Sequence, residues 1–209
     1  MMAKVVAFRG KETSASPAVL RKVPRRRPNI DVRTREYLTP DEVEALMEAA
    51  GKVGRHGHRD RTLLLLMYRH GLRVSETVDL KWDQFDFKAG RMHVNRLKNG
   101  NPATHYLEGD ELRALRRLTR EYEGPFVFST ERGGPLTRST VNKLVERAGR
   151  ESGTTFPVHP HMLRHACGFY LANKGVDTRT IQDYLGHRNI THTVRYTQLA
   201  SRRFKGLWR

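Results

Sequence analysis

Cysteine is almost absent from this sequence, which contains only Cys167 in 209 residues. An internal disulfide is therefore excluded, and the composition suits a reducing compartment. Cys167 lies within an apolar helical pattern, so we expect it to pack rather than to react. Long apolar runs are also missing, because the longest, Leu63 to Met67, is far shorter than the ~18 residues that span a bilayer. Residues 1–8 lack the apolar core and cleavage site of a signal peptide, so we expect a cytoplasmic protein without membrane contact.

Acidic residues are scarce beside basic ones: 22 Asp and Glu face 39 Lys and Arg, and the formal net charge is +17. Such an excess favours a polyanionic partner, because side chains that neutralise phosphates release condensed counterions. Hydrophobic residues reach 37% and aromatic residues 8%, which is lean but sufficient for one domain.

The beginning of the chain is polar, interrupted by prolines and rich in cations. We interpret residues 1–36 as a flexible basic arm that follows the phosphates of a polyanion. The alternative is a solvated tail that only aids solubility. The cations concerned are Arg21, Lys22, Arg25, Arg26 and Arg27.

Residues 37–209 are expected to form one mostly helical α+β domain with a small three-stranded antiparallel sheet. Thr39, Pro40 and Glu42 form a capping box that predicts the first helix start. Periodicity, caps and glycine stops predict helices over residues 40–50, 59–70, 111–122, 138–150, 161–174 and 178–185, and strands over residues 82–87, 91–97 and 103–107. A short helix after Gly71 is predicted to continue through residues 77–80. A short C-terminal tail follows, and its apolar residues are free to pack on this chain or on a neighbouring subunit. These residues are Phe204, Leu207 and Trp208.

The segment Gly71-Leu72-Arg73-Val74-Ser75-Glu76 follows the second predicted helix. Gly71 ends that helix, so Arg73 projects from a tight corner and Glu76 is spaced to orient it. The functional interpretation is an arginine that binds phosphate. The alternative is an ordinary surface pair of Arg73 with Glu76, which contributes only ~0–1 kcal/mol.

A hairpin is predicted between the second and third strands, with Asn99-Gly100 as its turn. Lys98 would lie at the tip, where it either enters a functional site or stays exposed as a turn lysine. Arg96 and Lys88 are weaker candidates for the same function. The helix over residues 111–122 turns four arginines outward, either toward a polyanion or simply into solvent. They are Arg113, Arg116, Arg117 and Arg120.

The stretch His159–Tyr196 combines histidine, arginine and tyrosine in a fixed order. His161, Arg164 and His165 are spaced i, i+3, i+4 and share one face of a helix. Gly175 ends this helix, Asp177 caps the next, and Gly186 ends that one. His187 follows at once, and Tyr196 comes nine residues later.

A zinc site is a second interpretation of the same histidines. Paired imidazoles at i, i+4 bind zinc, and His159, His161 and His165 could form a cluster. The fixed cation of Arg164 and the lack of nearby carboxylate or thiolate ligands argue against this interpretation.

The order His-x-x-Arg, Gly-His, Tyr resembles the C-terminal catalytic box of the tyrosine recombinases, the phage integrase family. Gly-Leu-Arg-x-Ser-Glu resembles the family's first arginine motif, and Lys98 matches its hairpin lysine. His-Pro-His-Met-Leu-Arg-His and Gln-Asp-Tyr-Leu-Gly-His-Arg-Asn-Ile look most like the compact recombinases that flip fimbrial promoter segments. The resemblance covers about residues 37–208 and supplies six catalytic positions. These are Arg73, Lys98, His161, Arg164, His187 and Tyr196.

The resemblance implies a mostly helical catalytic domain that cuts and rejoins DNA through a 3′-phosphotyrosyl link. The link retains the bond energy, so neither ATP nor a metal is expected. Implied partners are double-stranded DNA, further copies of this chain in a dimer or tetramer on recombination sites, and an accessory DNA-bending protein. Such a protein would act at the nucleoid.

Residue types suggest a role for each position. Two guanidiniums, Arg73 and Arg164, suit the non-bridging phosphate oxygens, because each offers a planar fork with a permanent charge. Tyr196 is the expected nucleophile and His161 the expected base. His187 would donate to the phosphate. Lys98 would protonate the departing 5′ oxygen.

Two other functions remain open from the sequence alone. A tyrosine-type topoisomerase would use similar residues but would relax any supercoiled DNA, and a non-catalytic DNA-binding regulator would need none of the six. Many relatives also carry an N-terminal domain that clamps DNA, whereas only the basic arm precedes Thr39 here. How one face of the duplex would be gripped is therefore open.

Overall fold

The fold is that of a computed structural model, which describes residues 36–96 and 102–200. Helix α2 (Pro40–Lys52) begins with the predicted capping box: the Thr39 hydroxyl accepts a hydrogen bond from the Glu42 amide, and the Glu42 carboxylate accepts one from the Thr39 amide. Gly51 does not end this helix, which continues to Lys52. Helix α3 (Gly57–Arg69) packs on α2 and begins two residues before the predicted start.

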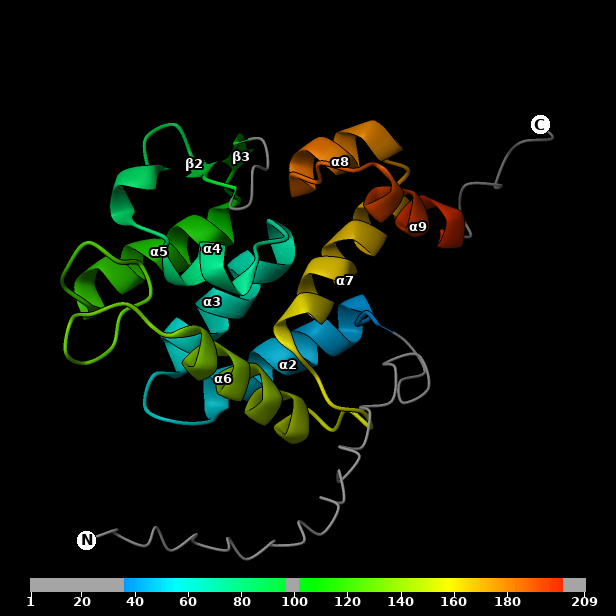
Figure 1. The fold of residues 1–209 in the computed structure, drawn as a ribbon. Coiled ribbons are helices and arrows are strands. Elements are labelled where there is room, and N and C mark those ends of the chain that lie inside the picture. Colours follow the sequence, from blue (N-terminus) through cyan, green and yellow to red (C-terminus); the bar gives the residue numbers. More distant parts are fainter. Residues whose placement is uncertain (1–35, 97–101, 201–209) are drawn as a thin grey trace, which may run out of the picture. The chain divides into compact units, whose positions relative to one another are not determined.

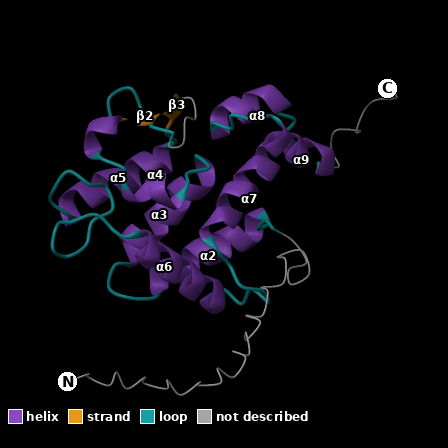
Figure 2. Cartoon of the chain, viewed as in Figure 1, coloured by secondary structure: helices purple, strands orange, loops and turns teal. Residues whose placement is uncertain are grey.

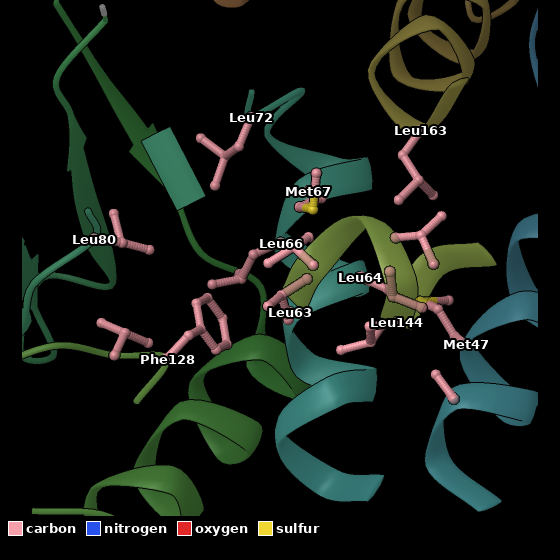
Figure 3. Close-up of a cluster of buried hydrophobic side chains, with 14 of the residues drawn as sticks. Met47, Leu63, Leu64, Leu66, Met67, Leu72, Leu80, Phe128, Leu144 and Leu163 are labelled. Carbon is pink, nitrogen blue, oxygen red and sulfur yellow. The ribbon is translucent and has the colours of Figure 1, made fainter. Parts of the chain in front are cut away.

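The main core lies where α2, α3, α6 (Arg138–Glu151) and α7 (Pro160–Asn173) meet. Side chains from all four helices converge there (Figure 3), including Met47, Leu64, Leu144 and Leu163, and each is 5% exposed or less. Helix α5 (Gly109–Glu121) packs on the other side of α3. Burial of this apolar surface is the main favourable term that holds the helices together.

The sheet has three short antiparallel strands in the order β1-β2-β3, as the sequence predicted. They are β1 (Phe85–Asp86), β2 (Arg91–Val94) and β3 (Ala103–Tyr106), and the β2–β3 register pairs Met92 with His105. Lys98, at the predicted hairpin tip, lies outside the described residues, as does the C-terminal tail with Phe204, Leu207 and Trp208.

The first predicted strand was too long. Residues Trp82–Gln84 form a 3-10 turn, η1, instead. The Trp82 amide donates to the Pro125 carbonyl, and Lys81 pairs with Phe126, so the backbone at the start of this turn bonds a distant segment. The turn contacts β2 through the Gln84 side chain, which donates to the His93 carbonyl at 2.8 Å. The short helix that was predicted to continue through residues 77–80 ends earlier: α4 covers Val74–Val78.

Helix α7 connects the core to the end of the molecule that carries α8 (Thr178–Leu185) and α9 (Thr191–Leu199) (Figure 1). Asp177 caps α8 through the amides of Arg179 and Thr180, and Gly186 ends it with φ +64°, both as predicted. Helix α8 also contacts β3, where the Tyr184 and His105 rings are 4.0 Å apart. Most of the described chain is helical (Figure 2), and none of its helices is long and apolar enough to cross a bilayer.

One residue of α7 differs from its neighbour in burial. Tyr170 is 41% exposed, whereas Phe169 is 5% exposed. Its ring meets Tyr68 edge-on at 6.2 Å, and the Lys174 ammonium lies 5.5 Å from the ring centre. An amphipathic phenol tolerates such a half-exposed position.

Candidate active site

The corner that carries Arg73 requires its glycine. Gly71 has φ +56°, and a Cβ there would lie 2.3 Å from the side chain of Leu185. Leu72 is fully buried and anchors the turn. Arg73 is the N-cap of α4 (Val74–Val78). The Glu76 carboxylate accepts hydrogen bonds from the Arg73 amide, at 2.9 Å, and from the Arg73 guanidinium, at 2.6 Å. The prediction that Glu76 orients Arg73 is confirmed.

A second arginine, Arg96, supports this corner. Its side chain is fully buried and donates to Glu76 at 3.0 Å and to the backbone carbonyl of Tyr184 at 2.5 Å. Burial alone would raise the pKa of Glu76, but Arg96 and Arg73 together hold it below its usual value. Because Arg96 is enclosed in this ion pair, it acts as a support that joins the Arg73 corner to α8.

Arg164 ties three parts of the site together from α7. It is 1% exposed, and its guanidinium donates to the Gly71 carbonyl and, at 2.6 Å, to the Leu185 carbonyl. Burial and the neighbouring cations Arg73 and Arg96 lower its pKa to about 9, so it remains charged at neutral pH. A guanidinium has five N–H donors, so these two bonds leave others for a ligand.

Tyr196, on α9, is packed against α7 and is 1% exposed. Its ring lies directly over Gly168, where a Cβ would be 2.6 Å from a ring carbon, and meets the Phe169 ring edge-on at 5.1 Å. Its hydroxyl forms a 2.8 Å hydrogen bond with Nδ1 of His165. Burial raises the pKa of the Tyr196 phenol, whereas the charges of Arg164, Arg195 and Arg73 oppose that shift.

The histidines of the site are held neutral at physiological pH. Burial and the charge of Arg164 lower the pKa of His161 to about 4 and that of His187 to about 3. His161 nevertheless keeps part of its surface open to solvent. His187 is fixed through its Nδ1, which lies 2.9 Å from the hydroxyl of the buried Thr193, and its ring is 6.2 Å from that of Tyr196.

A cavity of about 690 Å³ lies beside Arg73 and His187. Arg73 and His187 line it together with the turn after α8, and its other cations come from Arg179 and Arg188. A cationic, hydrogen-bond-donating cavity of this kind suits an anionic ligand such as a phosphodiester.

The structure therefore brings together five residues that the sequence singled out, and the sixth, Lys98, lies outside the described residues. Those brought together are Arg73, His161, Arg164, His187 and Tyr196. From the sequence, His165 was considered only for the zinc cluster, and Arg96 only as a weaker alternative to Lys98. The signal for His165 was present in its spacing from His161, but its partner lies 31 residues away.

The histidines considered for zinc do not gather into a metal-binding arrangement. Within residues 36–96 and 102–200, no group of three or more His, Cys, Asp or Glu side chains is placed to hold a metal ion. Cys167 is buried, and burial raises the pKa of its thiol to about 12, which agrees with the packing role expected for it.

Comparison with known proteins identifies the family of this chain. The model of the phage integrase family matches residues 36–203. The chain is 49% identical over 181 residues to the type 1 fimbriae regulatory protein FimE of Escherichia coli K12, an alignment that covers 83% of this chain and 91% of FimE.

Two solved structures share the fold. XerA recombinase aligns with a TM-score of 0.69 and 26% identity, over 79% of this chain and 61% of XerA. A lambda integrase dimer bound to a COC′ core site aligns with a TM-score of 0.62 and 25% identity, over 75% of this chain and 59% of the integrase fragment in that structure. The chain therefore spans about three fifths of each of these two solved chains. It belongs to the phage integrase family, the tyrosine recombinases, and is an enzyme that breaks and rejoins DNA.

Proposed function

We propose that Tyr196 attacks a DNA phosphodiester held by Arg73 and Arg164, forming a 3′-phosphotyrosyl link. The observation that carries this proposal is geometric: Arg164 binds the Gly71 carbonyl at the corner that carries Arg73, and the Tyr196 ring lies 6.2 Å from that of His187, which lines the same cavity as Arg73. The charges of both arginines also oppose the effect of burial on the pKa of Tyr196. Arginine suits this position because its charge persists while negative charge builds up on the non-bridging oxygens.

The remaining steps are assigned to the residues beside this pair. His161 and His187 flank the phosphate position, and His187 donates a hydrogen bond to it. Lys98 is proposed to protonate the departing 5′ oxygen, because its hairpin starts from β2 and returns to β3 beside α8. The free 5′ hydroxyl of another strand then attacks the phosphotyrosine, which rejoins the DNA and releases Tyr196.

We further propose that the enzyme works as an assembly of several copies on paired sites, and that it inverts a DNA segment rather than integrating or excising one. The DNA-bound dimer of lambda integrase supports multimeric action. The close similarity to FimE along nearly all of that protein supports action on a regulatory segment. An accessory DNA-bending protein would bring the two sites together at the nucleoid.

A plasmid assay tests this function against the topoisomerase alternative. The substrate is a supercoiled plasmid that carries the inverted repeats flanking this protein's own gene, and the control plasmid lacks them. We expect inverted product from the first plasmid and little relaxation of the second. Equal relaxation of both plasmids without inversion would favour a topoisomerase, and binding without any strand cleavage would favour a DNA-binding regulator.

The basic arm, residues 1–36, is proposed to bind DNA phosphates outside the cleavage site. Deletion of residues 1–30 should weaken binding to every DNA sequence and reduce the log–log salt slope by ~0.9 for each phosphate that the arm no longer neutralises. The measurement is a titration of binding affinity at several salt concentrations.

A charge-only variant is the matched control for the deletion. It keeps the length of the arm but replaces Arg21, Lys22, Arg25, Arg26 and Arg27 with glutamine. It should reproduce the effect of the deletion, since the interactions are electrostatic. If neither variant changes the salt slope, the arm is only a solvated tail.

A further inference from the structure

We propose that His165 is the base that accepts the proton of Tyr196 as the tyrosine attacks DNA. This inference rests on the proposed function and concerns a residue outside the six-residue set. The geometric basis is direct, because His165 Nδ1 lies 2.8 Å from the Tyr196 hydroxyl, within the range of an acid–base contact.

Packing on both sides holds this contact in place. His165 is 6% exposed and Tyr196 is 1% exposed, so close packing restricts both side chains. Tyr196 is confined by the close approach of Gly168 and by the edge of the Phe169 ring. The hydrogen bond is therefore built into the α7–α9 packing and is not a chance surface contact.

His161 has a different environment. It lies one helical turn before His165, and the two rings are 4.4 Å apart in an edge-to-face contact. His161 is exposed, as is Arg195, whose guanidinium lies 5.8 Å from the Tyr196 ring. His161 therefore lies where an incoming DNA strand can reach it, which suits a contact with the phosphate.

The proton balance of the step is simple. Neutral His165 carries its hydrogen on Nε2 and accepts through Nδ1. The Tyr196 oxygen forms a bond to phosphorus while its proton passes to Nδ1, which produces an imidazolium. The bond from phosphorus to the 5′ oxygen breaks, and that oxygen takes a proton from the general acid. In the rejoining step the proton on Nδ1 returns to the tyrosine oxygen.

The surrounding charges couple this base to substrate binding. Burial and the groups facing His165, which are His161, Arg195, Arg164 and His159, lower its pKa to about 3 in the DNA-free enzyme. The phosphate would offset the cationic part of this effect, because an anion nearby favours the protonated imidazole. His165 thus becomes a stronger base when a phosphodiester occupies the site.

The test separates proton transfer from hydrogen bonding by changing the acidity of the nucleophile. His165→Asn keeps an acceptor near the Nδ1 position but cannot take the proton. Single-turnover cleavage is measured for the wild type, His165→Asn and His161→Asn, each with tyrosine or a ring-fluorinated tyrosine at position 196. Unfolding midpoints of all variants are measured in parallel.

His165→Asn should be slower by ~10²–10⁴-fold with ordinary tyrosine and should recover much of this loss with the fluorinated residue, because a more acidic phenol needs less help from a base. His161→Asn should show no such selective recovery. The proposal is overturned if His165→Asn cleaves at the wild-type rate or faster, if fluorination does not help it, or if His161→Asn is the variant that recovers. Failure of the wild type to form any adduct would instead refute the proposed function.

Discussion

Replacement of Tyr196 by phenylalanine is expected to abolish the covalent protein–DNA adduct while DNA binding persists. The change removes the nucleophilic oxygen, and loss of a nucleophile typically lowers the rate of a covalent mechanism by about 10⁴–10⁶-fold. The ring itself stays, so its packing on Gly168 and Phe169 is preserved. Loss of the hydrogen bond to His165 should reduce stability by only about 1 kcal/mol.

A second tyrosine on a neighbouring helix provides a matched control. Tyr184, on α8, also uses its hydroxyl in a hydrogen bond within the protein, donating to the Arg69 carbonyl at 2.9 Å. Tyr184→Phe should lose comparable stability yet still form the adduct. The measurement is a denaturing gel of enzyme and labelled DNA, together with a binding titration. An undiminished adduct from Tyr196→Phe would remove this residue from the nucleophile's role.

Replacement of Lys98 by alanine is expected to slow cleavage of normal DNA by ~10²–10⁴-fold, because a 5′ alkoxide is a poor leaving group without a proton donor. A thiol is far more acidic, with a pKa near ~8.5, so a bridging 5′ sulfur can leave unprotonated. Lys98→Ala should therefore recover most of its rate on a sulfur-substituted strand. The measurement is single-turnover cleavage of both substrates.

Two further variants are controls for the Lys98→Ala experiment. Arg73→Ala should lose activity on both substrates, since its charge serves the non-bridging oxygens that the sulfur leaves unchanged. Lys88→Ala changes a lysine of the β1–β2 turn, away from the site, and should cleave both substrates like the wild type. If Lys98→Ala gains no more from sulfur than the wild type does, the hairpin lysine is not the acid.

Local signals in the sequence were sufficient for most of the helix ends and for the order of the site motifs. Thr39 and Asp177 cap their helices through side-chain oxygens that reach backbone amides two or three residues away. Gly186 ends α8 because a left-handed residue there costs glycine little. Such features depend on neighbours in the chain, so a single sequence reveals them.

The strand prediction over residues 82–87 was wrong for its first three residues, for the opposite reason. The alternation of Trp82, Phe85 and Phe87 fits a strand, but hydrogen bonds to Pro125 and Phe126 determine the backbone at its beginning. Pairing between segments some forty residues apart in the sequence cannot be predicted from a local sequence pattern. The burial of Arg96 could not be predicted for the same reason, because its hydrogen-bond partners lie on α4 and α8.

The sequence alone determined the family, because six residue types in a fixed order are far more specific than any one of them. It also determined the chemistry that those types allow, through their charges and acidities. Only the tertiary structure decided which histidine contacts Tyr196. His161 and His165 share one helix face, and their spacing cannot distinguish them. The packing of α9 on α7 places the Tyr196 hydroxyl on His165 and leaves His161 exposed, because long-range burial, and not helical period, selects the contact.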